Sequence, residues 1–403
     1  MRILCIIQRY YPAIGGAEIL TKSLMDHLSK NHEVVVCTSN AQDIRSFWNK
    51  NTEKISVLNP VQYTVNRYEI VTSRELNTDE YLEKFPLASN YPGPFLPQLW
   101  NDLVCNPIEY DLIFVTAYPY DHILPAYVAA KKWKIPIVIM PLLHQEFPEL
   151  YLSSMKLTML DNADGIFVLS ESEKTTLTNY AIDPSKISVL PIPISVDEWE
   201  GIDSSKFRQK ISLKPEQKII LFTGSKAYVK GIIHLIEALR ILWKKRDDVF
   251  LVIIGPTTKE YEDYISKIPS SMQKNIIDLG AVDDKTKKEV FSSCDILAVP
   301  SKSESFGMVY LEAWLCKKPV IGCDIIPISE IIQNKKNGLL VKFGDVNELN
   351  NAITYLIENP NICNYYGVEG NAKIRKLDSK KILQDFENKC VLLVNNFKNQ
   401  ISE

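Results

Sequence analysis

The chain has 403 residues and a mass of 46.0 kDa, a length that favours two domains at about 150 residues each. Apolar residues make up 46% and charged residues 24% of the sequence, which excludes a disordered, collagenous or low-complexity chain. Lys plus Arg total 46 and Asp plus Glu 49, so the net charge of −3 gives no reason to expect nucleic acid as a partner.

The cysteines and the apolar runs indicate the compartment. The eight cysteines form no Cys-x-x-Cys pair, which predicts buried thiols in a reducing compartment and neither a disulfide framework nor a zinc site. The first apolar run ends at Gln8, too short for the core of a signal peptide, and no run of about 18 apolar residues follows. We therefore expect a soluble, cytoplasmic protein, with peripheral contact to the inner face of the membrane left open.

Short apolar runs alternate with amphipathic stretches through the first half of the chain. Runs rich in Val, Ile and Leu predict buried strands at 2–7, 33–38, 111–116, 136–140 and 165–169. Helical spacing of apolar residues predicts helices between them, such as Glu18–Lys30 and His122–Lys134. Strands that alternate with helices are typical of a parallel sheet covered on both faces. Residues 41–100 show weak periodicity and a proline cluster, and are interpreted as an irregular excursion from the first domain.

The same alternation restarts in the second half. Strands are predicted at 218–223, 249–254, 276–279, 295–299, 319–322 and 338–342. Before them, residues 189–199 contain two prolines among apolar residues, a pattern that favours a stiff linker. We expect one domain at 1–190, a second at 195–379, a cleft between them, and a C-terminal helix at about 380–403 that packs back on the first domain.

Loops that follow predicted strands carry unusual residues, at the edge of a parallel sheet where ligands bind. Gly15 and Gly16 follow the first strand, and paired glycines let a backbone approach a ligand closely. Lys226 and Lys230 follow the first strand of the second half, and two cations beside a helix start suit a diphosphate. The loop at 279–282 offers only its backbone, which fits the edge of a planar base. Each pattern alone is also compatible with a structural role, as an ordinary turn for the glycines and as solvated surface residues for the lysines.

The loop after the strand at 295–299 carries the strongest pattern. A helix is predicted to begin near Phe306, so the backbone N–H groups of residues 305–307 would suit a phosphate. Glu304 lies just outside this helix start, and Glu312 lies about 8–9 Å farther along the helix axis. Two carboxylates so placed would flank a bound diphosphate. The alternative makes Glu304 a first-turn acid favoured by the helix dipole and Glu312 a solvated helix residue.

Taken together, these motifs resemble family 4 of the retaining GT-B glycosyltransferases over nearly the whole chain. The anchors are GGAE at 15–18, GSKAYVKG at 224–231 and ESFGMVYLE at 304–312, which spells Glu-x7-Glu, with further matches in KPVIG at 318–322 and NGLL at 337–340. The resemblance implies an α/β protein of the GT-B class, in which two Rossmann-like domains face each other across a cleft. It places the nucleotide-sugar donor mainly on the second domain and the acceptor mainly on the first.

The resemblance also implies roles for particular residues. The donor-binding set, with the expected contacts, is Glu304 for the sugar hydroxyls, Ser305, Phe306 and Gly307 for the diphosphate, Lys230 for the phosphates, Glu312 for the ribose, Val282 for the base, and Gly15 and Gly16 for the diphosphate from across the cleft.

The chain departs from the family pattern at three positions. Ser195 stands where the family usually has a Gly before Val-Asp. Ser225 stands where the family usually has an Arg, so Lys226 is expected to take over its phosphate contact, without the planar fork of a guanidinium. Thr116 ends the strand where the family commonly has its active-site His. His122 follows six residues later and is the candidate replacement, although a lone His is often structural. His144 is the candidate on the acceptor side.

The expected activity is retaining, metal-independent transfer of a sugar from a UDP- or GDP-linked donor to a hydroxyl of a saccharide, glycolipid or glycoconjugate acceptor, in surface polysaccharide or glycoconjugate synthesis. Glu304, His122 and Lys230 are the expected catalytic residues. No cofactor and no metal are expected, since the chain contains no Asp-x-Asp. The alternatives are a nucleotide-sugar epimerase on the same fold and a nucleotide-sugar-binding protein with impaired catalysis.

Overall fold

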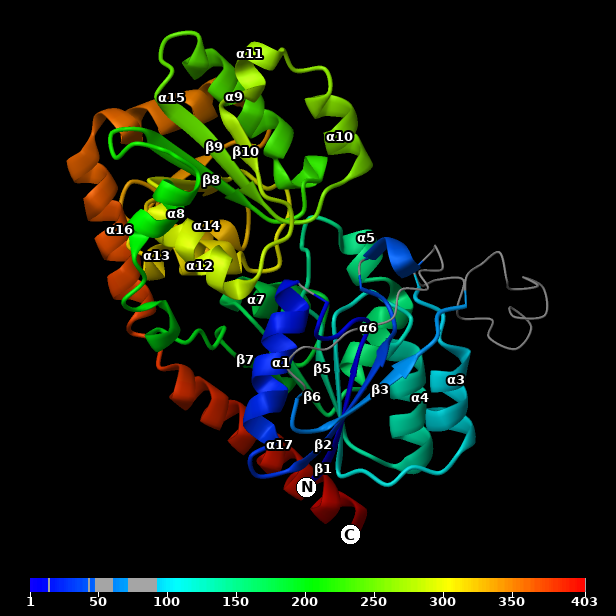
Figure 1. The fold of residues 1–403 in the computed structure, drawn as a ribbon. Helices are drawn as coiled ribbons and strands as arrows, with labels where there is room; N and C mark the ends of the chain where they lie inside the picture. The colour runs from blue at the N-terminus through cyan, green and yellow to red at the C-terminus, as the bar shows by residue number, and fades with distance from the viewer. Residues whose placement is uncertain (14, 43, 48–60, 72–92, 403) are drawn as a thin grey trace. The chain divides into compact units, whose positions relative to one another are not determined.

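The structure is a computed structural model that describes residues 1–13, 15–42, 44–47, 61–71 and 93–402. It divides the chain into two units, one formed by Met1–Pro193 with Ser379–Glu403 and the other by Ile194–Asp378. Each unit contains one sheet, and all the strand pairs of both sheets are parallel (Figure 1), which confirms the α/β class.

The N-terminal unit is built on a seven-stranded sheet in the order β3-β2-β1-β4-β5-β6-β7. Its strands are β1 (Arg2–Ile7), β2 (Glu33–Ser39), β3 (Thr64–Tyr68), β4 (Leu112–Thr116), β5 (Ile137–Met140), β6 (Gly165–Val168) and β7 (Ile187–Val189). Its helices are α1 (Gly16–Leu28), α3 (Pro97–Trp100), α4 (Ile123–Trp133), α5 (Pro148–Tyr151), α6 (Ser154–Asp161), α7 (Glu171–Asn179) and α17 (Ser379–Ser402), with short turns η1 (Ile44–Phe47), η3 (Asn101–Cys105) and η4 (Pro184–Lys186). The strand order reverses between β1 and β4.

The second unit is built on a six-stranded sheet in the order β10-β9-β8-β11-β12-β13. Its strands are β8 (Lys218–Thr223), β9 (Val249–Ile254), β10 (Ile276–Asp278), β11 (Ile296–Val299), β12 (Val320–Cys323) and β13 (Leu339–Val341). Its helices are α8 (Ser204–Lys210), α9 (Ile232–Trp243), α10 (Lys259–Ile265), α11 (Ser270–Gln273), α12 (Asp284–Ser293), α13 (Met308–Leu315), α14 (Ile328–Ile331), α15 (Val346–Glu358) and α16 (Pro360–Ile374), with short turns η5 (Asp197–Trp199) and η6 (Tyr228–Lys230). Here the order reverses between β8 and β11.

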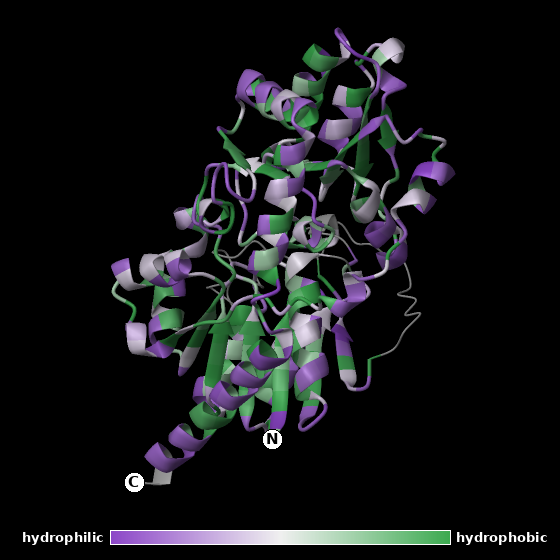
Figure 2. Cartoon of the chain, turned by 90° about the vertical axis from the view of Figure 1, so that its left-hand side faces the viewer, coloured by the Kyte–Doolittle hydropathy of each residue, from purple (hydrophilic) through white to green (hydrophobic). Residues whose placement is uncertain are grey.

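The central strands are continuous apolar runs because helices cover both faces of each sheet. In β1 the five residues from Ile3 to Ile7 are fully buried, and β4 is buried along its whole length. Figure 2 shows the strands of the N-terminal unit in green, the apolar end of the scale, whereas its helices alternate between green and purple. This contrast is the amphipathic pattern from which the elements were predicted.

The last helix, α17, belongs to the N-terminal unit, and Figure 1 shows it beside α1. Its Phe386 is fully buried and packs edge-on against Phe114 of β4 and Phe167 of β6, with ring centroids 5.6 and 5.1 Å apart. On the same helix the Glu387 carboxylate lies 2.8 Å from His27 Nε2 and accepts a hydrogen bond from the Asn31 amide at 2.9 Å. Aromatic packing and polar contacts therefore both attach α17 to the N-terminal unit.

The predicted strands are confirmed to within one or two residues, but two strands were missed. β3 lies inside the stretch 41–100 that was interpreted as irregular, and most of that stretch falls outside the described residues. β7 has only three residues and ends at Val189, where the linker was predicted to begin. The chain passes from one unit to the other at Pro193–Ile194, within the predicted linker.

Two smaller predictions concern the cysteines and membrane spans. All eight cysteines are free, and five are buried, but Cys105 is exposed, so the prediction of buried thiols is wrong for that residue. In the ranges that the structure describes, no helix has both the length and the apolar character needed to cross a bilayer.

Candidate functional site

In the second unit, the loops after β8 and β11 lie next to each other where the strand order reverses. The two strands pair directly, and the open end of a sheet at such a reversal is where α/β proteins bind ligands. The loops are joined by the Lys302 N–H, which donates to the Val229 carbonyl at 2.7 Å. Gly231 permits this approach, since a Cβ there would lie 2.1 Å from the Pro300 carbonyl oxygen and the backbone is left-handed, with φ of 78°.

Lys230 and Glu304 form an ion pair between these two loops. Lys230 Nζ lies 2.7 Å from Glu304 Oε1 and also donates to the Ser303 carbonyl at 3.1 Å. The same carboxylate oxygen accepts a hydrogen bond from the Ser301 hydroxyl at 2.8 Å. Both charged side chains keep part of their surface exposed, so a ligand can reach them. The structure thus brings together two of the three residues expected to be catalytic.

Helix α13 begins directly after this pair. Its first residue is Met308, two residues later than predicted, and Gly307 caps it in the left-handed region with φ of 88°. Among the described residues, no partner is found for the backbone N–H groups of Ser305, Phe306 and Gly307. Unpaired N–H groups at a helix start, together with the helix dipole, favour a bound anion.

Glu312 lies on the buried side of α13 and forms an ion pair with Lys287 of α12. Its side chain is 6% exposed, so the alternative in which it is a solvated helix residue is wrong. Burial raises the pKa of this carboxyl, whereas the neighbouring Lys287 opposes the rise. Its Oε2 atom is buried and has no hydrogen-bond partner within the described part of the chain.

Lys226 does not join the group around Glu304. Its side chain is 1% exposed, and its ammonium lies 2.6 Å from Asp278 Oδ1 and 2.8 Å from the Thr257 hydroxyl. These contacts hold it at the ends of β9 and β10 and away from the Lys230–Glu304 pair, so the structure gives no support to the predicted phosphate contact. Val282 lies in the loop after β10, four residues beyond Asp278, and is partly exposed.

In the N-terminal unit, Gly15 and Gly16 lie at the start of α1, directly after the loop that leaves β1. A Cβ at Gly15 would lie 2.2 Å from Glu18 Oε2, so the glycine makes room for this buried carboxylate. Glu18 forms an ion pair with Arg9 at 2.8 Å. Sequence reasoning missed Arg9, although a cation two residues beyond a buried strand was a usable signal.

His122 is buried at the end of β4, beside the reversal of strand order in this unit. Its Nε2 atom donates to the Thr116 carbonyl oxygen at 2.7 Å, which leaves Nδ1 without a partner among the described residues. Burial lowers the pKa of His122 to about 4, so the ring is neutral at pH 7. A neutral imidazole with a free Nδ1 lone pair can accept a hydrogen bond from a hydroxyl.

Asp121, which sequence reasoning also missed, precedes His122. Asp121 is almost fully buried. Burial raises the pKa of this carboxyl to about 8, while a backbone hydrogen bond from Gly93 and the charge of Lys156 oppose the rise. His144, the predicted acceptor-side residue, lies elsewhere in the unit against Tyr151 of α5, with ring centroids 5.6 Å apart.

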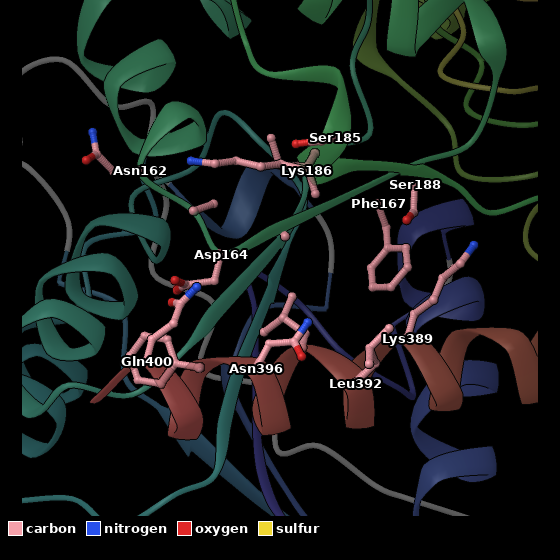
Figure 3. A pocket seen from close by; sticks show the side chains of 15 residues that line it. Asn162, Asp164, Phe167, Ser185, Lys186, Ser188, Lys389, Leu392, Asn396 and Gln400 are labelled. Carbon is pink, nitrogen blue, oxygen red and sulfur yellow. The ribbon is translucent and has the colours of Figure 1, made fainter. Parts of the chain in front are cut away.

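A pocket of about 490 Å³ lies at the opposite end of the N-terminal sheet, between α17 and the amino ends of β6 and β7 (Figure 3). Its lining mixes amide, hydroxyl and aromatic side chains, among them Asn162, Phe167, Ser188 and Asn396. It contains none of the residues predicted to bind donor or acceptor, and the candidate site lies instead at the carboxyl ends of the strands.

Comparison with known proteins identifies the class to which the two units belong. Residues 14–198 match the domain described as Glycosyltransferase Family 4, and residues 203–373 match Glycosyl transferases group 1. The fold is similar to that of Anabaena Alr3699/HepE, solved in complex with UDP and glucose, with a TM-score of 0.73 and 19% identity over 96% of this chain and 99% of that one. Two parallel-sheet units with these matches define a GT-B glycosyltransferase.

The chain belongs to family 4 of the glycosyltransferases, since the two matched domains together cover most of its length. An uncharacterized glycosyltransferase from Methanocaldococcus jannaschii is 34% identical over 36% of this chain and 36% of its own length. A D-inositol 3-phosphate glycosyltransferase from Mycobacteroides abscessus is 27% identical over 45% of this chain and 42% of its own length. The chain thus spans less than half of the length of these two relatives.

Proposed function

We propose that the chain transfers a sugar from a UDP- or GDP-linked donor to a hydroxyl of a saccharide, glycolipid or glycoconjugate acceptor, in surface polysaccharide or glycoconjugate synthesis. The observation that carries the proposal is the Lys230–Glu304 pair placed directly before the start of α13. A cation, an acid and unpaired N–H groups meet there at the reversal of strand order, as a sugar diphosphate requires. The UDP found in the Anabaena neighbour supports a uridine donor.

The proposed donor contacts follow from this geometry. Glu304 accepts hydrogen bonds from the sugar hydroxyls, and Lys230 neutralises the charge that builds up on the departing diphosphate. The N–H groups of Ser305–Gly307 bind the same phosphates at the helix start. The free Oε2 of Glu312 accepts a ribose hydroxyl, and the backbone of the loop at 280–282 recognises the base.

We propose transfer with retention of anomeric configuration. The acceptor attacks from the face that the diphosphate leaves, and a departing phosphate oxygen takes the acceptor proton, so no enzyme nucleophile is needed. Charge stabilisation by Lys230 and the helix start is then the main contribution of the protein, because a nucleoside diphosphate is already a good leaving group. On the N-terminal unit, the Nδ1 lone pair of His122 is proposed to accept a hydrogen bond from a sugar hydroxyl.

The test is an assay of nucleoside diphosphate release from a panel of nucleotide sugars, with and without acceptors. Glu304→Gln keeps the shape of the side chain but removes its charge, and we expect turnover to fall about 100-fold or more. Glu262→Gln, an exposed acid on α10, is the matched control and should leave turnover unchanged. Wild-type turnover in Glu304→Gln would overturn the proposal.

The same assay separates the alternatives. A transferase releases nucleoside diphosphate faster when a suitable acceptor is present. An epimerase on this fold changes the sugar without any acceptor, and a binding protein with impaired catalysis binds the donor without turnover. Release that depends on an acceptor therefore distinguishes the proposed function from both.

We further propose that catalysis needs no metal ion, on the ground that the sequence contains no Asp-x-Asp with which carboxylates would hold a metal against phosphates. EDTA should then leave the rate within about twofold of its starting value, because cationic side chains and N–H groups provide the charge. A rate abolished by EDTA and restored by Mg²⁺ would show that a metal is required.

A further inference from the structure

Lys226 occupies an unusual environment for a surface loop. It lies three residues beyond β8, yet its side chain is 1% exposed. Taking an ammonium out of water is costly unless a partner of opposite charge and further hydrogen bonds compensate it. Here Asp278 at the end of β10 and the hydroxyl of Thr257 beyond β9 supply these contacts, at 2.6 and 2.8 Å. One cation therefore joins the ends of three neighbouring strands.

The carboxylate that pairs with Lys226 also fixes the next turn. Asp278 Oδ1 accepts a hydrogen bond from the Gly280 N–H at 3.0 Å. Gly280 is left-handed, with φ of 67°, and its carbonyl accepts from the Gly255 N–H at 2.7 Å. The ion pair thus lies at the base of the loop that continues to Ala281 and Val282, and it holds the backbone on which that loop turns.

Further contacts hold Lys226 itself in place. Its N–H donates to the Pro256 carbonyl at 3.0 Å, and its own carbonyl accepts from the Thr258 hydroxyl at 2.8 Å. The ring of Tyr261 lies 5.2 Å from Nζ, within range of a cation–π contact. The backbone and the side chain of Lys226 are therefore both held by contacts with the loops after β9 and β10.

The two lysines of the GSKAYVKG motif consequently have different surroundings. Lys230 is partly exposed and contacts Glu304, beside the helix start proposed to bind the diphosphate. Lys226 is buried, and none of its contacts in the described residues involves that helix start or Glu304. A residue so enclosed can influence the donor only through the loop that it holds.

We propose that Lys226 is a positioning residue that, through Asp278, holds the loop at 280–282 in the conformation that recognises the nucleobase, and that it makes no contact with the diphosphate. This inference rests on the proposed function, in which that loop binds the base. On this proposal the Lys226–Asp278 ion pair, which lies at the base of the loop, determines which base is preferred. Lys230 and the start of α13 bind the diphosphate.

The test compares binding of a nucleoside, its monophosphate and its diphosphate, with uridine and guanosine as the two series, by calorimetry and by NMR titration for the weak ligands. Lys226→Met should weaken all three ligands of the preferred series by the same factor, about tenfold, and bring the affinities of UDP and GDP closer together. Lys230→Met is the matched comparison, and its loss should grow from the nucleoside to the diphosphate.

The variant Asp278→Asn tests the positioning role independently. A positioning role predicts that Asp278→Asn weakens the three ligands by one common factor, as Lys226→Met does, because the ammonium and the Gly280 N–H then face a neutral amide oxygen in place of a carboxylate. Lys226→Gln, whose amide can still bond to Asp278, should recover much of the affinity and shows that the fold tolerates the change.

Three results would overturn the inference. One is a loss in Lys226→Met that appears only when phosphates are present, and another is unchanged or tighter diphosphate binding in Asp278→Asn. The third is unchanged discrimination between UDP and GDP in both variants. If the wild-type chain binds neither UDP nor GDP, the proposed function itself fails, which is a different outcome from any of these.

Discussion

At the end of β4, two adjacent titratable residues are buried with opposite preferences for a proton. Burial keeps His122 neutral by lowering its pKa to about 4, and it favours the neutral form of Asp121 by raising its pKa to about 8. Both effects have the same cause, because removal from water penalises whichever form carries a charge. These two side chains are therefore mainly uncharged near neutral pH.

The raised pKa of Asp121 should be detectable as a difference in the pH dependence of stability between the wild type and Asp121→Asn. Between pH 5 and 7 the folded carboxyl of Asp121 holds a proton that the unfolded chain has released, so wild-type stability falls as pH rises through this window. His122 acts in the opposite direction up to about pH 6.5, since its folded pKa is the lower one. Asn does not titrate, so the variant should gain about 2 kcal/mol relative to wild type from pH 5 to pH 7.

Urea unfolding at each pH measures this difference. Lys156, with its pKa lowered to about 8 by burial, stays mostly charged in the chosen window and adds little to the comparison. Thr175→Ser, at an exposed position of α7 without a titratable group, is the control and should give a difference that does not change with pH. A flat difference for Asp121→Asn as well would show that its carboxyl titrates normally.

Single residues near the site were only partly predictable from the sequence. Lys230 and Glu304 were found because each lies in a short motif directly after a strand, and neighbouring strands bring such loops together. The partners of Lys226 and Glu312 were not found. Asp278 and Lys287 lie on other elements, 52 and 25 positions away in the chain, and no local pattern records such a pairing.

At the scale of the elements, the position of α13 relative to its loop depends on Gly307. The residue adopts φ of 88°, which costs an L-residue about 1–2 kcal/mol. A Cβ there would in addition lie 2.7 Å from the Tyr310 ring and 2.8 Å from Ile328 Cδ1. The glycine thus lets the helix start at Met308 while its first turn packs against α14.

Gly307→Ala should therefore cost about 2–3 kcal/mol of stability and weaken nucleoside diphosphate binding about tenfold, because the helix start must move. Gly201→Ala is the matched control, since Gly201 has φ of 69° but no atom within 4 Å of the Cβ that an alanine would add. It should cost only the backbone term, about 1 kcal/mol, and leave binding unchanged. Urea unfolding and calorimetry of both variants measure the two effects, and equal losses in both would contradict this role of Gly307.

The elements that were predicted and those that were missed differ in burial. Central strands such as β1 and β8 are apolar throughout, because both faces are covered, and such runs are easily recognised. In the edge strand β3 exposed and partly buried residues alternate from Thr64 to Arg67, and only the last residue, Tyr68, is buried, so the strand lacks an apolar run. At the other edge, β7 has three residues with Ser188 in the middle, too few for any periodicity.

At the scale of the whole molecule, the path of the chain determines which segments share a core. After the second unit is complete, α17 returns to the N-terminal unit, so the first and last segments of the sequence share one core. Phe386 supplies the apolar contact and Glu387 the polar one, and Glu387 is separated from its partners His27 and Asn31 by 360 and 356 positions in the chain. The helical pattern predicts this helix, but only the structure identifies the side chains that attach it.

Phe386→Ala should destabilise the N-terminal unit in particular. Removing a fully buried aromatic ring costs about 3–5 kcal/mol, because apolar contact is lost and a cavity remains between α17 and the rings of Phe114 and Phe167. Hydrogen exchange followed by mass spectrometry gives the free energy of opening for each segment, and the loss should be concentrated in β4, β6 and α17. Leu392→Ala, on the same helix but 60% exposed, is the control and should change stability by less than about 0.5 kcal/mol. If segments of the second unit such as β8 and β9 lost as much protection as β4, or if Leu392→Ala had the same effect, then attachment of α17 through Phe386 would not be what stabilises the N-terminal unit.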